Sequence, residues 1–203
     1  FHRVLFRPAF AVQARELTQS QTQLQNQIEK VSDHLFEKGA MVIPGEIGYD
    51  LNYYSVKLTS IASGNTLAQF TTDTVLTGGS SGVKARIIGT DALSGSDPDT
   101  LYIKYNDSGT NNTNTAFSHG ETITGTNSDS VSLSAVVATC HTGSAAQVEE
   151  GTYYINGYHV QVSKQTIVLD KYTNTPSYRV GLLVTESFVT PNDDLTLNDN
   201  ATG

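Results

Sequence analysis

Histidine and cysteine are the side chains in this sequence with the best-known catalytic and metal-binding chemistry. The histidines (His2, His34, His119, His141 and His159) are scattered, with no HExxH or HxH pair to chelate a metal. Cys140 stands next to His141, but adjacent strand residues point to opposite faces, so they are not expected to act as nucleophile and base. The sequence contains no GxSxG motif and no phosphate-binding glycine loop. We therefore predict no catalytic residue, no cofactor and a protein that is not an enzyme.

Acidic residues gather in two segments, where carboxylate and amide oxygens could bind calcium. The two groups are Asp91, Asp97 and Asp99, and Asp193, Asp194 and Asp199 with Asn192, Asn198 and Asn200. Neither group has the spacing of an EF-hand loop, with its glycine and terminal glutamate. Solvated loops are the preferred interpretation, and no metal site is predicted.

Composition and charge exclude several classes of partner. The chain has 203 residues and a net charge of −8, of which residues 1–38 carry +1 and residues 39–203 carry −9. Nucleic acids and anionic membranes are bound by clustered Lys and Arg, so neither is an expected partner. No apolar run approaches the roughly 20 residues of a membrane span. One cysteine excludes an internal disulfide framework, and the abundance of Thr, Ser, Asn and Gly is typical of a β-rich chain with many turns.

The clearest secondary-structure element that the sequence predicts is a helix over residues 13–38. This stretch contains no Gly or Pro and ends before Gly39. Its core candidates are spaced 4, 3, 4, 3 and 4 residues apart, which is the heptad pattern of a coiled coil. They form a self-association seam made of Leu17, Gln21, Leu24, Ile28, Val31 and Leu35. The flanking e and g positions are uncharged or histidine, so ion pairs cannot select the partner.

An alternative for this helix is packing against the β domain of its own chain. Helices that pack in this way usually present a wider apolar face, with a third apolar position in each heptad. Here only Phe36, which lies off the seam, could widen the stripe. The narrow seam therefore favours self-association, although the residues leave the number of chains open because Gln21 and Val31 depart from the dimer pattern.

From Met41 onward the apolar pattern has the period of a β-strand. Asn156-Gly157 stands between two alternating runs and predicts a type I′ hairpin turn, in which both residues need positive φ. Residues 178–188 also alternate and predict a further strand. We expect three parts: an N-terminal arm and helix over 1–40, an antiparallel β domain of 41–60 plus 147–203, and an inserted β region over 61–146.

The inserted region contains a weak internal repeat. Residues 70–78 and 117–125 share a leading Phe, an acidic residue followed by Thr and an aliphatic residue, and a closing Gly, at an offset of 47 or 48 residues. An alternating run follows each copy. The repeat predicts two similar hairpins of one small β-sandwich or barrel.

Several stretches of the sequence resemble an uncharacterised family of tailed-bacteriophage virion proteins. They are residues 6–19 (FRPAFAVQARELTQ), 24–28 (LQNQI), 150–157 (EGTYYING), 176–182 (PSYRVGL), 186–187 (ES) and 199–203 (DNATG). Members of this family are common in cyanophages and are described as tail-fibre or baseplate structural proteins. They continue well past the length of this chain, so we expect it to be part of a longer protein.

The resemblance implies a structural virion protein, the particle-proximal part of a phage tail fibre or baseplate subunit, which is assembled in the host cytoplasm. It also implies a homotrimer that contacts other tail or baseplate proteins. A carbohydrate-binding β module of a receptor-binding tail protein is the alternative, since ten Tyr could stack on host glycans, although Trp is absent. A tail-spike depolymerase would require many short β-helix rungs, which the sequence does not contain.

Overall fold

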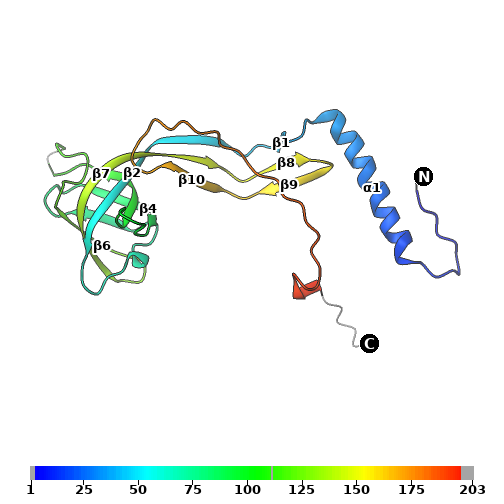
Figure 1. Ribbon diagram of the computed structural model, residues 1–203, viewed down its shortest axis with the longest axis horizontal. Coiled ribbons are helices and arrows are strands. Elements are labelled where there is room, and N and C mark those ends of the chain that lie inside the picture. The colour runs from blue at the N-terminus through cyan, green and yellow to red at the C-terminus, as the bar shows by residue number, and fades with distance from the viewer. Residues whose placement is uncertain (1–2, 111, 198–203) are drawn as a thin grey trace.

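The computed structural model describes residues 3–110 and 112–197. It confirms a mainly β protein with an N-terminal helix and two antiparallel sheets. The molecule is elongated, with the helix at one end, a closed sheet at the other and a narrow β stalk between them (Figure 1). The elements are α1 (Ala14–Leu35), β1 (Met41–Ile43), β2 (Ile47–Ile61), η1 (Leu67–Gln69), β3 (Val75–Gly78), β4 (Lys84–Asp91), β5 (Thr100–Asp107), β6 (Thr122–Thr126), β7 (Ser132–Val148), β8 (Gly151–Ile155), β9 (Tyr158–Val162), β10 (Gln165–Asp170) and η2 (Leu195–Leu197).

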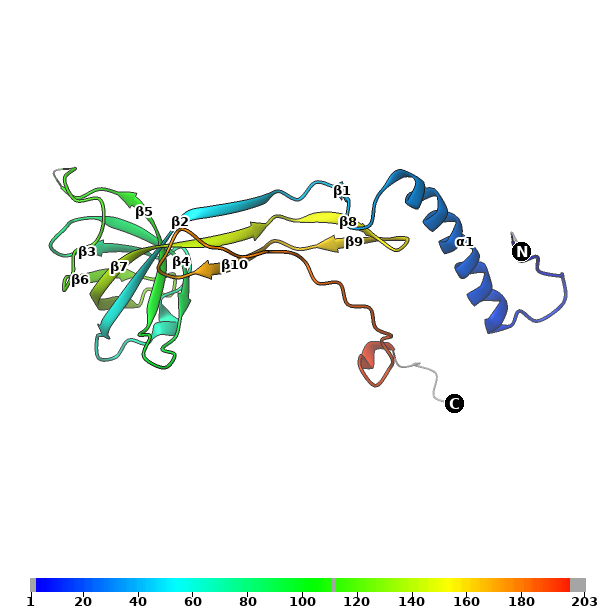
Figure 2. The same cartoon turned by 45° about the horizontal axis from the view of Figure 1, so that its top comes forward.

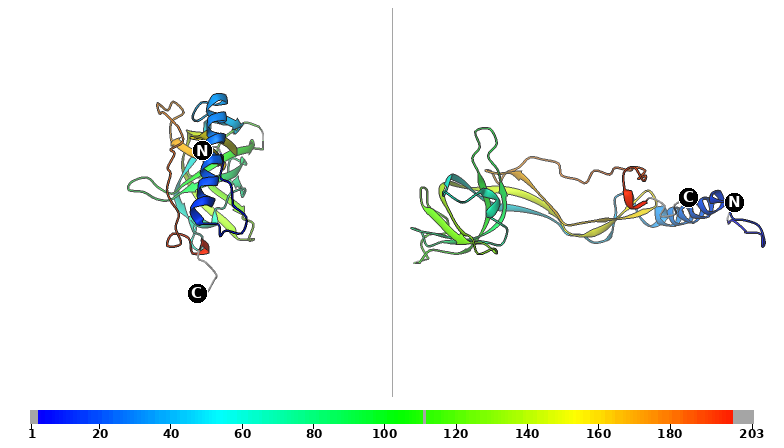
Figure 3. Two further views of the ribbon diagram at one scale, coloured as in Figure 1. Left: turned by 90° about the vertical axis from the view of Figure 1, so that its right-hand side faces the viewer. Right: turned by 90° about the horizontal axis from the view of Figure 1, so that it is seen from below.

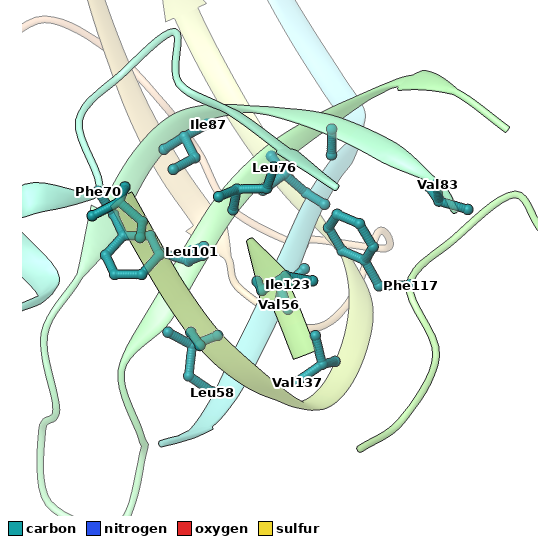
Figure 4. Packing of buried hydrophobic residues seen from close by; sticks show 14 residues of the cluster. Val56, Leu58, Phe70, Leu76, Val83, Ile87, Leu101, Phe117, Ile123 and Val137 are labelled. Carbon is teal, nitrogen blue, oxygen red and sulfur yellow. The ribbon is translucent and has the colours of Figure 1, made fainter. Parts of the chain in front are cut away.

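The larger sheet closes on itself and encloses the hydrophobic core. Its strand order is β10-β7-β2-β5-β4-β3-β6, and β6 also pairs with β7, so that six strands form a ring. Alternate residues of these strands point inward, as the period of two requires. The core inside the ring, drawn in Figure 4, consists of Val56, Leu58, Phe70, Leu76, Val83, Ala85, Ile87, Leu101, Ile103, Phe117, Ile123, Leu133, Ala135 and Val137.

The two copies of the repeat form two antiparallel hairpins of this ring. The first copy runs through β3, which pairs with β4, and the second runs through β6, which pairs with β7. The leading residues Phe70 and Phe117 are both buried in the core. β3 and β6 are neighbours and pair with each other, so the two copies lie side by side.

Two long strands run from the ring into the stalk. β2 and β7 pair from Ile61 opposite Ala135 in the ring to Ile47 opposite Val148 in the stalk (Figure 2). Both strands continue through the boundaries expected at 60/61 and 146/147. Gly143 lies where they leave the ring, and a Cβ there would meet the carbonyl oxygens of Asp170, Lys171 and Tyr53 at 2.6–2.9 Å. Glycine permits this close approach of three backbone segments.

The smaller sheet ends the stalk, and its hairpin has the predicted turn. β8 pairs with β9, and Asn156 and Gly157 both have positive φ, of 47° and 86°. This confirms the type I′ turn. β1 pairs with the other edge of β8.

Two details of the sequence prediction are wrong. The helix ends at Leu35, three residues earlier than expected, and Gly39, although its φ is positive, lies in the following turn rather than at the helix cap. Residues 178–188 form no strand: among the described residues, no backbone hydrogen bond joins 174–189 to another segment. This segment, which we call the strap, instead runs beside the stalk toward the helix end (Figure 3). Its apolar alternation is that of a strand, but it does not pair with the free edge of β10 or of any other strand.

Candidate self-association surface

The predicted seam lies on one face of α1 and is exposed in the single chain. At about 100° per residue, its six positions fall within roughly a quarter of the helix circumference. The five apolar seam side chains are between 41% and 66% exposed, and Gln21 is also exposed. A row of exposed apolar side chains at heptad spacing is typical of a helix that packs against other helices. The members of the seam are Leu17, Gln21, Leu24, Ile28, Val31 and Leu35.

Hydrogen bonds along a different face of α1 hold it on the β8–β9 hairpin. The side-chain amide of Gln25 donates to the carbonyl oxygen of Gly157 at 2.6 Å. The buried hydroxyl of Tyr154 is bonded to the Asp33 carboxylate and to the Glu29 carbonyl oxygen. The helix therefore packs on its own sheet through polar groups, and the apolar seam side chains remain exposed.

An aromatic cluster completes the contact at the end of the helix. The Phe36 ring lies 5.9 Å from that of Tyr154 and 6.3 Å from that of His159. Phe36 is the apolar residue that lies off the seam, and its packing against Tyr154 and His159 explains why an apolar residue is found there. Part of the helix therefore packs on its own chain, as the alternative interpretation expects, while the seam side chains are exposed.

Gly157 is required both by the turn and by the helix. Besides its positive φ, a Cβ at this position would lie 2.9 Å from Cβ of Glu29 and 3.0 Å from Nε2 of Gln25. The tight turn therefore brings its backbone directly against α1. This contact fixes the direction in which the helix leaves the stalk.

Cys140 and His141 are engaged separately. The Cys140 thiol packs against the core and donates to the Phe117 carbonyl oxygen at 3.5 Å, and burial raises its pKa. The His141 ring instead contacts the Tyr172 ring at 5.0 Å, and burial and the nearby Lys57 charge lower its pKa. The two groups share no contact that would activate a thiolate.

Asp91 and Asp97, two of the candidate calcium ligands, are paired with cations. Lys171 lies 2.6 Å from Asp91 and 3.0 Å from Asp97, and Lys57 lies 3.3 Å from Asp97. Hydrogen bonds from Tyr172 and then Lys171 lower the pKa of Asp97 to about 2. We call this cluster the clasp, because it ties the loop before β5 to the chain that follows β10.

Three of the remaining candidate calcium ligands are used locally. The carboxylates of Asp193 and Asp194 accept hydrogen bonds from Thr190 and Thr196, while Asp99 accepts one from the Leu93 amide. Asn198, Asp199 and Asn200 lie outside the described residues. Within residues 3–110 and 112–197, no group of three or more His, Cys, Asp or Glu side chains is placed to hold a metal ion.

Glu121 is a structurally important residue that the sequence did not reveal. It is buried, and its carboxylate accepts hydrogen bonds from the amides and hydroxyls of Ser80 and Ser81 and from the amide of Ser118. Burial opposes ionisation, but these donors outweigh it and hold the pKa of Glu121 below its usual range. The carboxylate holds together the turns that precede β4 and β6.

Comparison with protein-family models, curated proteins and solved structures gives no match to this chain. In the described part of the chain, no helix has the length and apolar character needed to span a membrane.

Proposed function

We propose that this chain is a structural virion protein, the particle-proximal part of a phage tail fibre or baseplate subunit, and that α1 joins three copies in a coiled coil. The observation that carries the self-association is the exposure of the complete heptad seam while another face holds the helix in place. The sequence resemblance supports the virion role and the number of chains.

The arrangement suits a mechanical role. A narrow stalk that carries a helix at one end and a closed sheet at the other can hold two parts of a particle apart (Figure 1). The proposal also treats the ring as a small β unit inserted between the two arms of the stalk domain. Other tail or baseplate proteins are its proposed partners, and the virion is its proposed location.

Light scattering of the full chain tests the self-association. At micromolar concentration the chain should have about three times its 21.8 kDa mass. The double variant Leu24→Asp with Ile28→Asp places charges at d and a positions and should give monomers with a folded β region. The matched control, Gln19→Asp with Asn26→Asp, adds the same charge to the opposite side of the helix and should leave the mass unchanged.

A monomeric wild-type chain would contradict the proposal. Complete unfolding of the seam variant would show instead that the seam supports the fold of its own chain. For the virion role, an antibody against the purified chain should decorate the tail of phage particles that carry this sequence. Particles without decoration at the tail or baseplate would exclude that role.

A further inference from the structure

A large apolar groove lies between the stalk and the strap. Its volume is about 930 Å³. One wall is the sheet, with Ile47, Tyr49 and Ile167; the other is the strap, with Val180 and Leu182. Two apolar walls of one chain therefore face each other with unfilled space between them.

The sheet wall belongs to a part of the molecule that has no second layer of its own. Tyr49, Ala146 and Ile167 lie opposite one another across β2, β7 and β10, so they share one face. Tyr49 and Ile167 remain more than half exposed there. A narrow sheet with one apolar face needs a covering layer for stability. The strap does not supply a complete one.

This region also contains a buried polar atom that lacks a hydrogen bond. The Tyr153 hydroxyl, whose residue lines the groove, is buried and has no hydrogen-bond partner among the described residues. Buried hydroxyls are normally bonded. The single chain therefore leaves this apolar face incompletely covered and one buried hydroxyl next to it without a hydrogen bond.

Charge favours another copy of the chain as the occupant. None of the described residues that line the groove is Asp, Glu, Lys or Arg, although the chain carries a net charge of −8. Copies that repel each other elsewhere can meet at an uncharged apolar surface, and the centres of protein interfaces are poor in charged residues. The seam of α1 has the same character, and Gly39, in the turn after the helix, lies in the groove wall.

The chain also carries apolar side chains that could fill such a groove. Leu183 and Phe188 of the strap are 90% and 99% exposed. Leu183 lines the groove together with Val180, Leu182 and Val184, which are less exposed. One molecule thus presents an apolar groove and exposed apolar side chains beside it, which is what contact between copies requires.

We propose that the groove is occupied by a second copy of this chain, through Leu183 and Phe188, the most exposed apolar side chains of its strap. This inference rests on the proposed self-association and extends that interface from the helix along the stalk. The assembled protein would then bury the stalk face as well as the seam.

Thiol labelling of the full chain in a Cys140→Ser background tests this proposal. Ile167→Cys reports on the groove, and Val75→Cys, at an apolar ring position that is 42% exposed, is the matched control. In the assembled chain, Ile167→Cys should react with a maleimide at least tenfold more slowly than Val75→Cys. Adding Phe188→Ser, or dissociating the chains with Leu24→Asp and Ile28→Asp, should remove the difference.

The other possible results distinguish failure of the groove proposal from failure of the proposed self-association. Equal rates in an assembled chain overturn the groove proposal and leave the helical seam intact, whereas a monomeric wild-type mass overturns both. Slow labelling that persists in a monomeric seam variant shows that the chain's own strap covers the groove, which also overturns the proposal. If the seam variant stays assembled and Ile167→Cys stays protected, the groove is supported and the seam is not required. Stoichiometric binding of anilinonaphthalene sulfonate to the assembled chain would assign the groove to a small apolar ligand instead.

Discussion

Thr77 of β3 and Thr124 of β6 lie directly opposite each other in the closed sheet, at the centre of a local two-fold relationship. On one side of this pair Leu76 faces Gly125, and on the other Gly78 faces Ile123. The repeat offset of 47 residues makes Leu76 equivalent to Ile123 and Gly78 to Gly125. The two hairpins therefore exchange places under this rotation and contribute matching residues to one core.

Equivalent core positions should contribute similarly to the free energy of unfolding. Leu76 and Ile123 are both fully buried, so Leu76→Ala and Ile123→Ala should each lower the free energy of unfolding by about 2–5 kcal/mol. Urea denaturation measures both values. Val75→Ala, at the neighbouring exposed position, should cost less than about 1 kcal/mol. A large loss at one site and none at the other would contradict the equivalence.

The buried carboxylate of Glu121 should be essential to the stability of the ring. Glu121→Gln keeps the shape but loses the charge and faces Ser80 and Ser81 with an amide, so we expect the free energy of unfolding to fall by about 2–3 kcal/mol. Asp107→Asn is the control, because Asp107 is exposed and its ion pair with Lys84 is long, at 3.9 Å. That change should cost less than about 0.5 kcal/mol. Equal effects of the two changes would show that the hydrogen bonds to Glu121 are not stabilising.

The clasp should make stability sensitive to acid. Because the pKa of Asp97 is lowered to about 2 in the folded chain and is about 3.9 in an unfolded one, its contribution is complete above about pH 5 and is lost progressively as the pH falls through about 2. Thermal unfolding of the wild type and of Asp97→Asn should therefore differ most at neutral pH and converge near pH 2. A constant difference over that range would exclude this linkage.

The hydroxyl of Tyr154 should hold the helix against the hairpin. Tyr154→Phe removes the bonds to Asp33 and Glu29, and a hydrogen bond to a charged group contributes about 1.5–3 kcal/mol. In the monomeric seam variant, amides of residues 25–35 should then exchange with solvent about tenfold faster or more. Tyr158→Phe, on the opposite face of the hairpin and half-exposed, should leave exchange unchanged. Identical exchange in the two variants would mean that Gln25 and Phe36 anchor the helix without this hydroxyl.

Local patterns predicted the elements that depend on neighbours in the sequence. Asn156-Gly157 predicts its turn because both residues must adopt positive φ, and the heptad spacing predicts the position of α1 and its apolar face. The repeat predicted two hairpins because each copy carries its own aromatic and acidic residues. These features can be recognised without knowing which segments meet in space.

Features that depend on distant partners could not be predicted. Glu121 resembles any acidic residue in a turn until Ser80 and Ser81, some forty positions earlier, supply the donors. The strap has the alternation of a strand, but a strand forms only where the segment pairs with a partner, and the pattern alone does not show whether it pairs. The face of α1 that contacts the hairpin is polar and carries no apolar signal.

The uninterrupted course of β2 and β7 determines how the molecule would bear a load. A pull on α1 reaches β2 through the short β1 segment and is directed along the strand axis. The cross-strand hydrogen bonds to β7 and β5 would then be strained together in shear, instead of opening one after another as in peeling. Tension between the two ends would therefore be shared along the whole ladder, and the ring would resist extraction of the strand.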